Sequence, residues 1–164
     1  MENILIRSMI PEDWKMVKKI YESGIETGVA TFELNAPDWN KWNTDHLPFS
    51  RLVATEKDIL GWAALTPVSN RCVYGGVAEV SVYVSLNNRG RGIGKKLLSE
   101  LVIESEKNGI WTLQAGIFAE NFASIKLHEK VGFKLIGQRE KIGKLHNVWK
   151  DTVLMERRSK TVGI

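Results

Sequence analysis

The stretch AEVSVYVSLNNRGRGIGK, residues 78–95, decides the fold, because it joins an alternating strand to a glycine-rich turn that opens an amphipathic helix. In the strand, Glu79, Ser81 and Tyr83 alternate with three valines, and this period of two is typical of a β-strand. The helix carries apolar residues at helical spacing, namely Ile93, Leu97, Leu98, Leu101 and Val102. A strand, a turn and a helix therefore follow one another.

The turn has the composition of a pyrophosphate-binding loop. Its glycines are Gly90, Gly92 and Gly94, and its cations are Arg89, Arg91 and Lys95. Glycines let the backbone approach an anion, and the first turn of a helix presents unpaired N–H groups with a partial positive charge. A glycine-rich turn that merely joins strand to helix is the alternative.

Two better-known phosphate loops do not fit these residues. A Walker A loop requires Ser or Thr where Lys96 stands, and a dinucleotide-binding GxGxxG requires glycine where Lys95 stands. The turn therefore belongs to another class of anion site.

Length and composition predict one globular domain over residues 1–164, since 43% of the 164 residues are hydrophobic and 26% are charged. No apolar run reaches the roughly 18 residues of a membrane span. The opening MENILIRSMIPED lacks the order of a signal peptide, so we expect a cytoplasmic protein.

Cysteine, histidine and net charge exclude several classes. Cys72 is the single cysteine and the three histidines are scattered, so we expect no disulfide and no metal. The net charge of +4 comes without a dense basic stripe interleaved with aromatics, so we expect no nucleic-acid partner. Part of the positive excess lies in the glycine turn and part in the tail from Arg157 to Lys160.

The remaining pattern predicts a mixed α/β order. We expect strands over 4–9, 52–55, 59–66, the stretch containing Glu79, 111–118, 133–138 and 148–156. Helices are expected after Pro11, ending at Gly24, then near 38–45, from Ile93 to Asn108, and over 123–131. The three strands between residues 52 and 84 are expected to be antiparallel.

The glycine turn resembles motif A, [RQ]-x-x-G-x-[GA], of the GNAT acyl-CoA-dependent N-acetyltransferases, and the order of elements matches that fold along nearly the whole chain. The resemblance implies a single-domain α/β (α+β) fold with a mixed, mostly antiparallel twisted sheet flanked by helices. It implies that Gly90 to Lys95, Ile93 included, hold the pyrophosphate of acetyl-CoA. It also implies that backbone groups of Val82, Tyr83 and Val84 pair with the pantetheine arm, beside a bulge or splay of the sheet near Val82.

A second cluster, AENFASIKLHEKVGF at 119–133, resembles the segment of that superfamily in which an asparagine precedes a short helix. Asn121, Ser124 and His128 are spaced i, i+3 and i+7, so they share one side of the helix. The resemblance implies that Asn121 and Ser124 contact the cofactor and that His128 donates a proton to the departing thiolate or steadies it. An exposed helix histidine without a role is the alternative.

Three further marks resemble the phosphinothricin and methionine sulfone (sulfoximine) acetyltransferases within this superfamily. They are VATFE at 29–33, Arg71-Cys72-Val73-Tyr74, and the strand with Glu79. The resemblance implies a homodimer that acetylates the α-amino group of small amino-acid-like compounds. Cys72-Val73 and Val77 depart from the common pattern, which leaves the substrate open.

The chemistry requires a proton acceptor, because an amine must lose a proton before it attacks a thioester carbonyl. Glu79 can take that proton directly or through water, and Arg71 can grip a carboxylate while Phe32, Cys72, Val73 and Tyr74 frame the pocket. Transfer would then be direct, since Cys72 has no base beside it. A structural ion pair of Glu79 at the sheet edge and a surface role of Arg71 are the alternatives.

Two other functions remain open. A chain with this fold can bind acyl-CoA without catalysis, although Glu79 and His128 favour an enzyme. The acceptor can also be a polyamine, an aminoglycoside or a protein N-terminus, although Arg71 favours a carboxylate.

Overall fold

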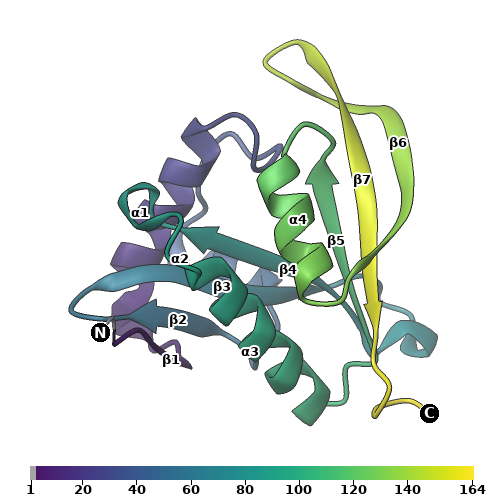
Figure 1. Cartoon of the computed structure of the whole chain (residues 1–164), viewed down its shortest axis with the longest axis horizontal. Helices are drawn as coiled ribbons and strands as arrows, with labels where there is room; N and C mark the ends of the chain where they lie inside the picture. The colour runs from purple at the N-terminus through teal and green to yellow at the C-terminus, as the bar shows by residue number, and fades with distance from the viewer. Residues whose placement is uncertain (1–2) are drawn as a thin grey trace.

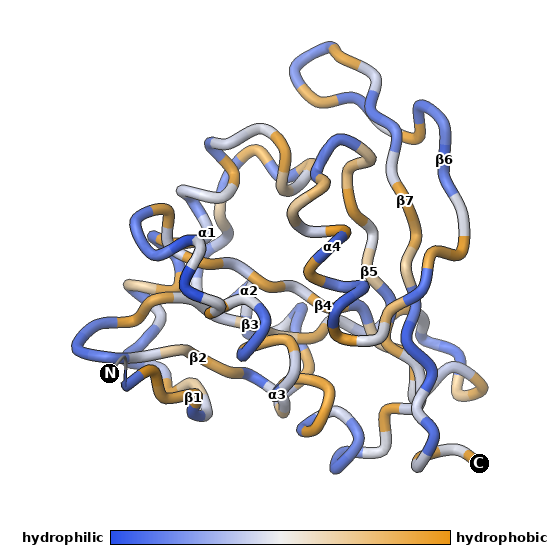
Figure 2. Tube along the Cα trace, in the orientation of Figure 1, coloured by the Kyte–Doolittle hydropathy of each residue, from blue (hydrophilic) through white to orange (hydrophobic). Residues whose placement is uncertain are grey.

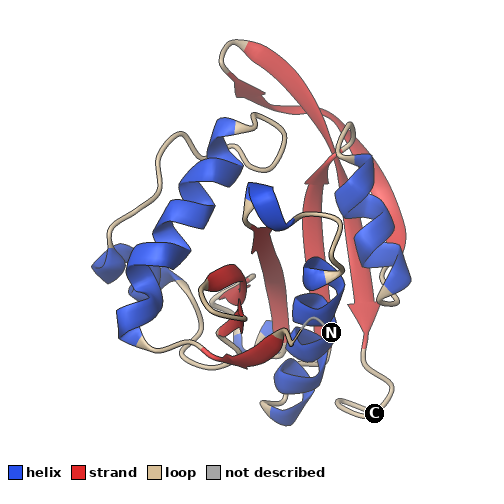
Figure 3. Ribbon diagram, turned by 60° about the vertical axis from the view of Figure 1, so that its left-hand side comes forward, coloured by secondary structure: helices blue, strands red, loops and turns tan. Residues whose placement is uncertain are grey.

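The computed structural model describes residues 3–164, which form one seven-stranded sheet with helices on both faces (Figures 1 and 3). The sheet order is β1-β2-β3-β4-β5-β7-β6. The strands are β1 (Leu5–Ser8), β2 (Leu52–Thr55), β3 (Ile59–Pro67), β4 (Val77–Val84), β5 (Thr112–Phe118), β6 (Lys134–Leu145) and β7 (Val148–Arg158). Neighbours run antiparallel except β4 and β5, which are parallel.

The helices are α1 (Trp14–Glu26), α2 (Trp39–Asp45), α3 (Ile93–Lys107) and α4 (Phe122–Lys130). Three short 3₁₀ turns accompany them: η1 (Pro11–Asp13), η2 (Cys72–Tyr74) and η3 (Leu86–Asn88). None of the helices in the described residues is long and apolar enough to cross a membrane.

The alternation of β3 and β4 divides the apolar residues between two cores, and Figure 2 shows hydrophobic residues, in orange, along the strands of the sheet. Ala63, Leu65, Ala78 and Val80 pack with α3, and residues of α4 lie against this larger core. The opposite face of β3 carries the fully buried Trp62, which packs with α1 and α2 in a smaller aromatic core. The sheet therefore separates an α1/α2 side from an α3/α4 side.

The parallel pairing of β4 with β5 is short, and this feature positions the site. It holds for three pairs and ends at Glu79 with Gln114, whereas β4 stays in continuous register with β3 as far as Val84. From Val80 onward β4 has no β5 partner, and the two strands diverge (Figure 1). The irregularity expected near Val82 is thus a splay of the sheet, without a bulge in the β3–β4 pairing.

Two predicted boundaries are wrong. Gly24 does not end α1, which continues to Glu26. A Cβ on Gly24 would lie 2.6 Å from the Tyr83 ring, so this glycine permits close packing of α1 on the sheet. The strand expected to end at Gln138 instead runs to Leu145, because β6 and β7 continue as a hairpin that projects beyond the helices (Figure 1).

Candidate active site

The glycine turn before α3 has the geometry of an anion site. Gly90 and Gly92 adopt left-handed φ values of 80° and 75°, and a Cβ at either position would meet no atom within 4 Å. The first helical bond runs from the Lys96 amide to the Gly92 carbonyl at 3.1 Å, so the preceding amides of the helix start lie free of the helical ladder. The turn is therefore open as well as electropositive.

The third glycine has a different task. A Cβ on Gly94 would lie 3.1 Å from Cδ2 of Leu127, which is closer than ordinary van der Waals contact. Gly94 therefore lets α4 pack closely on the first turn of α3. This contact holds the Leu127 turn of α4 against the start of α3.

The three cations of the turn differ in their surroundings. Arg89 and Lys95 are exposed. Arg91 instead donates to Asn88 at 2.7 Å and forms an ion pair with Glu56 at 3.2 Å. Neither Glu56 nor Asn88 was predicted from the sequence, because neither belongs to a phosphate motif.

Glu79 lies at the point where β4 and β5 part. Its carboxylate Oε1 accepts from Gln114 Nε2 at 3.4 Å and lies 3.6 Å from where a Cβ of Gly116 would be. The side chain is half-buried, on the central strand of the sheet. An ion pair at a sheet edge, the alternative for this residue, does not fit that position.

The segment 29–33 covers the same side of the splay. The Phe32 ring packs edge-on against Phe118 at the end of β5, with ring centroids 4.7 Å apart. The backbone carbonyl of Val29 accepts from Asn121 Nδ2 at 3.2 Å. Residues 29–33 thus bridge β5 and the start of α4 and cover the gap between β4 and β5, and we call them the roof segment.

Two phenols lie under this roof. Burial and the charge of Glu33 raise the pKa of Tyr21 to about 12, and burial raises the pKa of Tyr83 well above its ordinary value. Both therefore stay protonated at neutral pH. Of the side chains on this face of β4, the carboxylate of Glu79 is the one suited to accept a proton.

Asn121 and Ser124 mark the start of α4. The side-chain oxygen Oδ1 of Asn121 accepts from the Ser124 amide at 3.2 Å and caps the helix. With its bond to Val29, Asn121 joins the roof segment to α4. That either residue contacts a cofactor stays a prediction.

His128 is buried, with 5% of its surface exposed, so it is not the exposed helix histidine that was the alternative. Its Nδ1 lies 2.7 Å from the Ser124 carbonyl oxygen, and its ring packs edge-on against Phe133. Burial lowers the pKa of His128, which the bond to the carbonyl partly offsets. At neutral pH the ring is neutral, with Nδ1–H donating and Nε2 carrying the lone pair.

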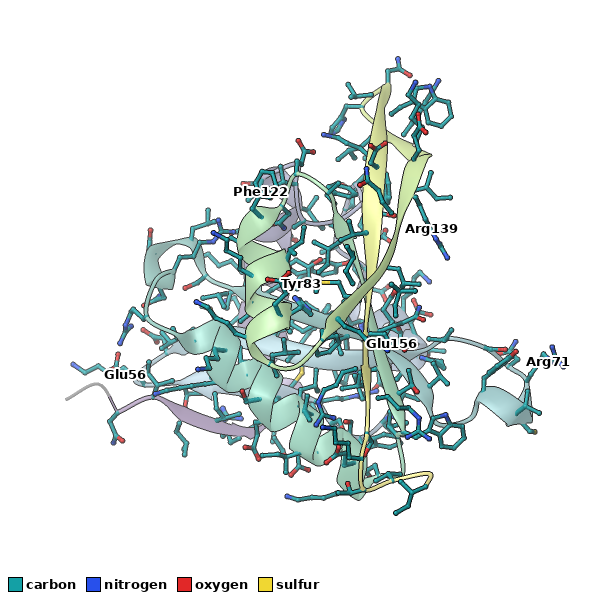
Figure 4. The ribbon with its side chains drawn as sticks, turned by 45° about the vertical axis from the view of Figure 1, so that its right-hand side comes forward. Glu56, Arg71, Tyr83, Phe122, Arg139 and Glu156 are labelled. Carbon is teal, nitrogen blue, oxygen red and sulfur yellow. The ribbon has the colours of Figure 1, made fainter. Side chains whose placement is uncertain are left out.

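The predicted substrate-binding segment lies apart from these residues. Arg71, Cys72, Val73 and Tyr74 are all exposed on the β3–β4 connection. The Arg71 guanidinium lies 5.6 Å from the centre of the Tyr74 ring. Figure 4 shows Arg71 at the periphery, far from Tyr83. Within residues 3–164 no group of three His, Cys, Asp or Glu side chains is placed to hold a metal ion.

The fold, the splayed strands and the glycine turn define an acetyltransferase of the GNAT class. The profile of the Acetyltransferase (GNAT) family matches residues 14–133, and the chain belongs to this family.

Relatives within the family act on amino-acid-like compounds. The chain is 32% identical to the phosphinothricin N-acetyltransferase of Alcaligenes faecalis, over 93% of this chain and 81% of that protein. It is 34% identical to the L-methionine sulfoximine/L-methionine sulfone acetyltransferase of Pseudomonas aeruginosa, over 64% of this chain and 62% of that protein. For that relative the matched region therefore spans less than two thirds of its length.

Solved structures match over nearly the whole chain. A phosphinothricin acetyltransferase from Sinorhizobium meliloti in complex with AcCoA has a TM-score of 0.89 and 31% identity, covering 99% of this chain and 91% of that one. A ribosomal-protein-alanine N-acetyltransferase from Brucella melitensis has a TM-score of 0.88 and 32% identity, covering 94% and 99%. The predicted fold is confirmed.

Proposed function

We propose that this chain is an acetyl-CoA-dependent N-acetyltransferase that acts on the α-amino group of a small amino-acid-like substrate, such as phosphinothricin, methionine sulfoximine or methionine sulfone. The observation that carries the proposal is the parting of β4 from β5 at Glu79, beside the open turn at Gly90 and Gly92. One gap then offers a strand edge, an anion site and a proton acceptor.

The cofactor would lie along β4. The backbone of Val82, Tyr83 and Val84 would pair with the amide-containing pantetheine arm as a β5 neighbour would, and the turn from Arg89 to Lys95 would hold the pyrophosphate. Asn121 and Ser124 would flank the arm from the start of α4. The structure of the Sinorhizobium relative in complex with AcCoA supports acetyl-CoA as the cofactor.

The acetyl group would pass directly to the amine. The amine nitrogen forms a bond to the thioester carbonyl carbon, the C–S bond breaks, the amine proton goes to Glu79, and the thiolate leaves as part of CoA. Because His128 is neutral at neutral pH, its Nε2 must first take up a proton before it can donate to the thiolate. Glu79 and His128 would thus handle separate protons.

Arg71 would recognise the substrate carboxylate, with Cys72, Val73 and Tyr74 beside it and Phe32 on the roof segment; because residues 71–74 lie apart from Tyr83 within one chain, this part of the proposal rests on the relatives and not on the geometry of the gap. Support comes from the likeness to the sulfoximine and phosphinothricin enzymes, whose compounds carry a carboxylate. A cytoplasmic homodimer also stays part of the proposal.

The test combines binding and turnover. Gly92→Asp and Gly92→Asn are matched in size, and both residue types tolerate left-handed φ, so they differ mainly in charge. Calorimetry should show that the aspartate variant loses acetyl-CoA binding far beyond the asparagine variant. Equal affinity of the two would remove the turn from the cofactor site.

Turnover then identifies the acceptor. Acetyl-CoA consumption is measured with phosphinothricin, methionine sulfone and methionine sulfoximine, and with a polyamine and a peptide beginning with alanine as competitors. Preference for the amino-acid-like compounds supports the proposal. Preference for the peptide would instead point to the reaction named for the Brucella neighbour, and cofactor binding without turnover would point to a non-catalytic binder.

A further inference from the structure

A chain of hydrogen bonds holds the Arg91 guanidinium beside the glycine turn. Arg91 Nη1 donates to Asn88 Oδ1 at 2.7 Å, and Nη2 lies 3.3 and 3.2 Å from the two carboxylate oxygens of Glu56. Asn88 Nδ2 in turn donates to Ser85 Oγ at 2.7 Å. The Ser85 amide donates to the Leu60 carbonyl at 2.8 Å. This chain of hydrogen bonds therefore joins the β4–α3 connection to the β2–β3 hairpin.

The hairpin is shaped to place Glu56 there. The register of β2 and β3 shifts between Ala54 and Thr55, so Leu60 is passed over in the pairing. Glu56 follows directly after β2 and starts a turn in which its amide donates to the Asp58 carbonyl at 3.2 Å. Irregular pairing at a strand end re-aims the neighbouring side chains, and here the carboxylate reaches the glycine turn.

The ion pair between Arg91 and Glu56 is weak enough for another anion to replace the carboxylate. The Arg91 and Glu56 side chains are 23% and 35% exposed, and ion pairs this accessible stabilise a fold only weakly. A guanidinium also binds phosphate through paired charge-assisted hydrogen bonds, so a cofactor phosphate can replace the carboxylate as the partner of Arg91. Glu56 and Asn88 also border a hollow of about 520 Å³, which leaves the carboxylate room to turn away.

We propose that Glu56 is a positioning residue that holds the Arg91 guanidinium beside the anion site until a cofactor phosphate takes it over. Glu56 thereby weakens cofactor binding, because the phosphate must compete with the carboxylate for Arg91. The inference rests on the proposed function, since it requires a phosphate-bearing cofactor at Gly90 and Gly92.

The experiment compares Glu56→Gln with Asp58→Asn, a matched control that removes the same charge from the same turn. Calorimetric Kd values for CoA are measured in about 0.1 M salt, where the Debye length is about 10 Å. Glu56→Gln should bind CoA about fivefold more tightly than the parent protein. Asp58→Asn should change the Kd by less than about twofold, because the ion pair that Arg91 forms within residues 3–164 is with Glu56 and not with Asp58.

A second cycle isolates Arg91. In an Arg91→Gln background, Glu56→Gln should leave the CoA affinity unchanged, because no guanidinium remains to be released. Thermal unfolding of each variant shows whether the fold is kept. A crystal structure with CoA should place Arg91 on a phosphate oxygen, no longer within ion-pair distance of Glu56.

Several outcomes would overturn the inference. Weaker or unchanged CoA binding by folded Glu56→Gln would show that the carboxylate does not compete for Arg91. An equal gain in Asp58→Asn, or a gain that persists without Arg91, would reduce the effect to general charge. If the parent protein binds no CoA at all, the proposed function itself fails, which is a separate result.

Discussion

Asn121 tests how the roof segment is held over the site, because replacing one atom of its side chain removes one of its two hydrogen bonds and keeps the other. Its side-chain oxygen Oδ1 caps α4 by accepting from the Ser124 amide at 3.2 Å, and its side-chain nitrogen Nδ2 donates to the Val29 carbonyl at 3.2 Å. Asn121→Asp keeps the capping oxygen but replaces the donor with a second acceptor. The roof segment should then be released while α4 stays capped.

The magnitudes follow from these two bonds. Asp and Asn cap helices about equally well, so Asn121→Asp should lose only the bond to Val29, at about 1 kcal/mol or roughly 2–4 °C in unfolding temperature for a chain of this size. Asn121→Ala loses the cap as well as the bond to Val29, which costs about 1 kcal/mol more or roughly a further 2–4 °C. Loss of the bond to Val29 removes a net contribution of about 1 kcal/mol from the closed roof, which corresponds to about a fivefold rise in KM for the amine.

The assay is steady-state turnover with the best amine substrate, together with calorimetry of acetyl-CoA binding and thermal unfolding. We expect Asn121→Asp to raise the KM for the amine about fivefold and to leave the acetyl-CoA affinity nearly unchanged. The opposite split, with an unchanged amine KM and weaker acetyl-CoA binding, would refute the roof argument. It would show instead that Asn121 serves the pantetheine arm.

Three further predictions concern charge and protons. Arg71→Ala should raise the KM for a free amino acid but not for its methyl ester; equal losses on both would make Arg71 structural. Glu79→Gln keeps the shape of the side chain without the base, so kcat should fall by roughly 10² or more, and a parental rate would contradict its assignment. Burial lowers the pKa values of His128 and His46, so below about pH 6.5 the unfolded chain binds more protons and stability falls with falling pH. The His128→Gln variant should therefore lose less stability than the parent between about pH 7.5 and 5.5, because only His46 keeps its contribution. Thermal unfolding across this range measures the loss, and the same dependence of stability on pH in both proteins would contradict the prediction.

Local patterns predicted most of the fold, and the failures have a common cause. β4 and α3 were predicted from their sequence periods, which depend on nearby residues alone. The end of α1 was missed because the role of Gly24 is set by Tyr83, which is far away in sequence. The length of β6 was missed because its outer half is mostly exposed, with Lys141 at φ 45°, and pairs with β7 alone.

The candidate site likewise contains residues that the local sequence predicts and contacts that it does not. Gly90 and Gly92 could be recognised because turn, charge and helix start are contiguous, and their left-handed φ values agree with that reading. The partner of Arg91, Glu56, lies 35 residues away, and the partner of Asn121, Val29, lies 92 residues away. Neither contact leaves a local signal in the sequence.

The splay itself gives the site a direction. Backbone groups of β4 beyond Glu79 have no β5 partner, and unpaired backbone groups are costly to bury unless water or a ligand satisfies them. The five residues from Val80 to Val84 extend about 17 Å at the rise of a strand, with Glu79 at one end and the turn that begins at Arg89 beyond the other. On the proposed function, an extended, amide-containing arm laid along this edge would place its phosphates at the turn and its thioester toward Glu79. The reverse orientation would put the phosphates beside a carboxylate and away from the helix start, so electrostatics alone selects the productive one.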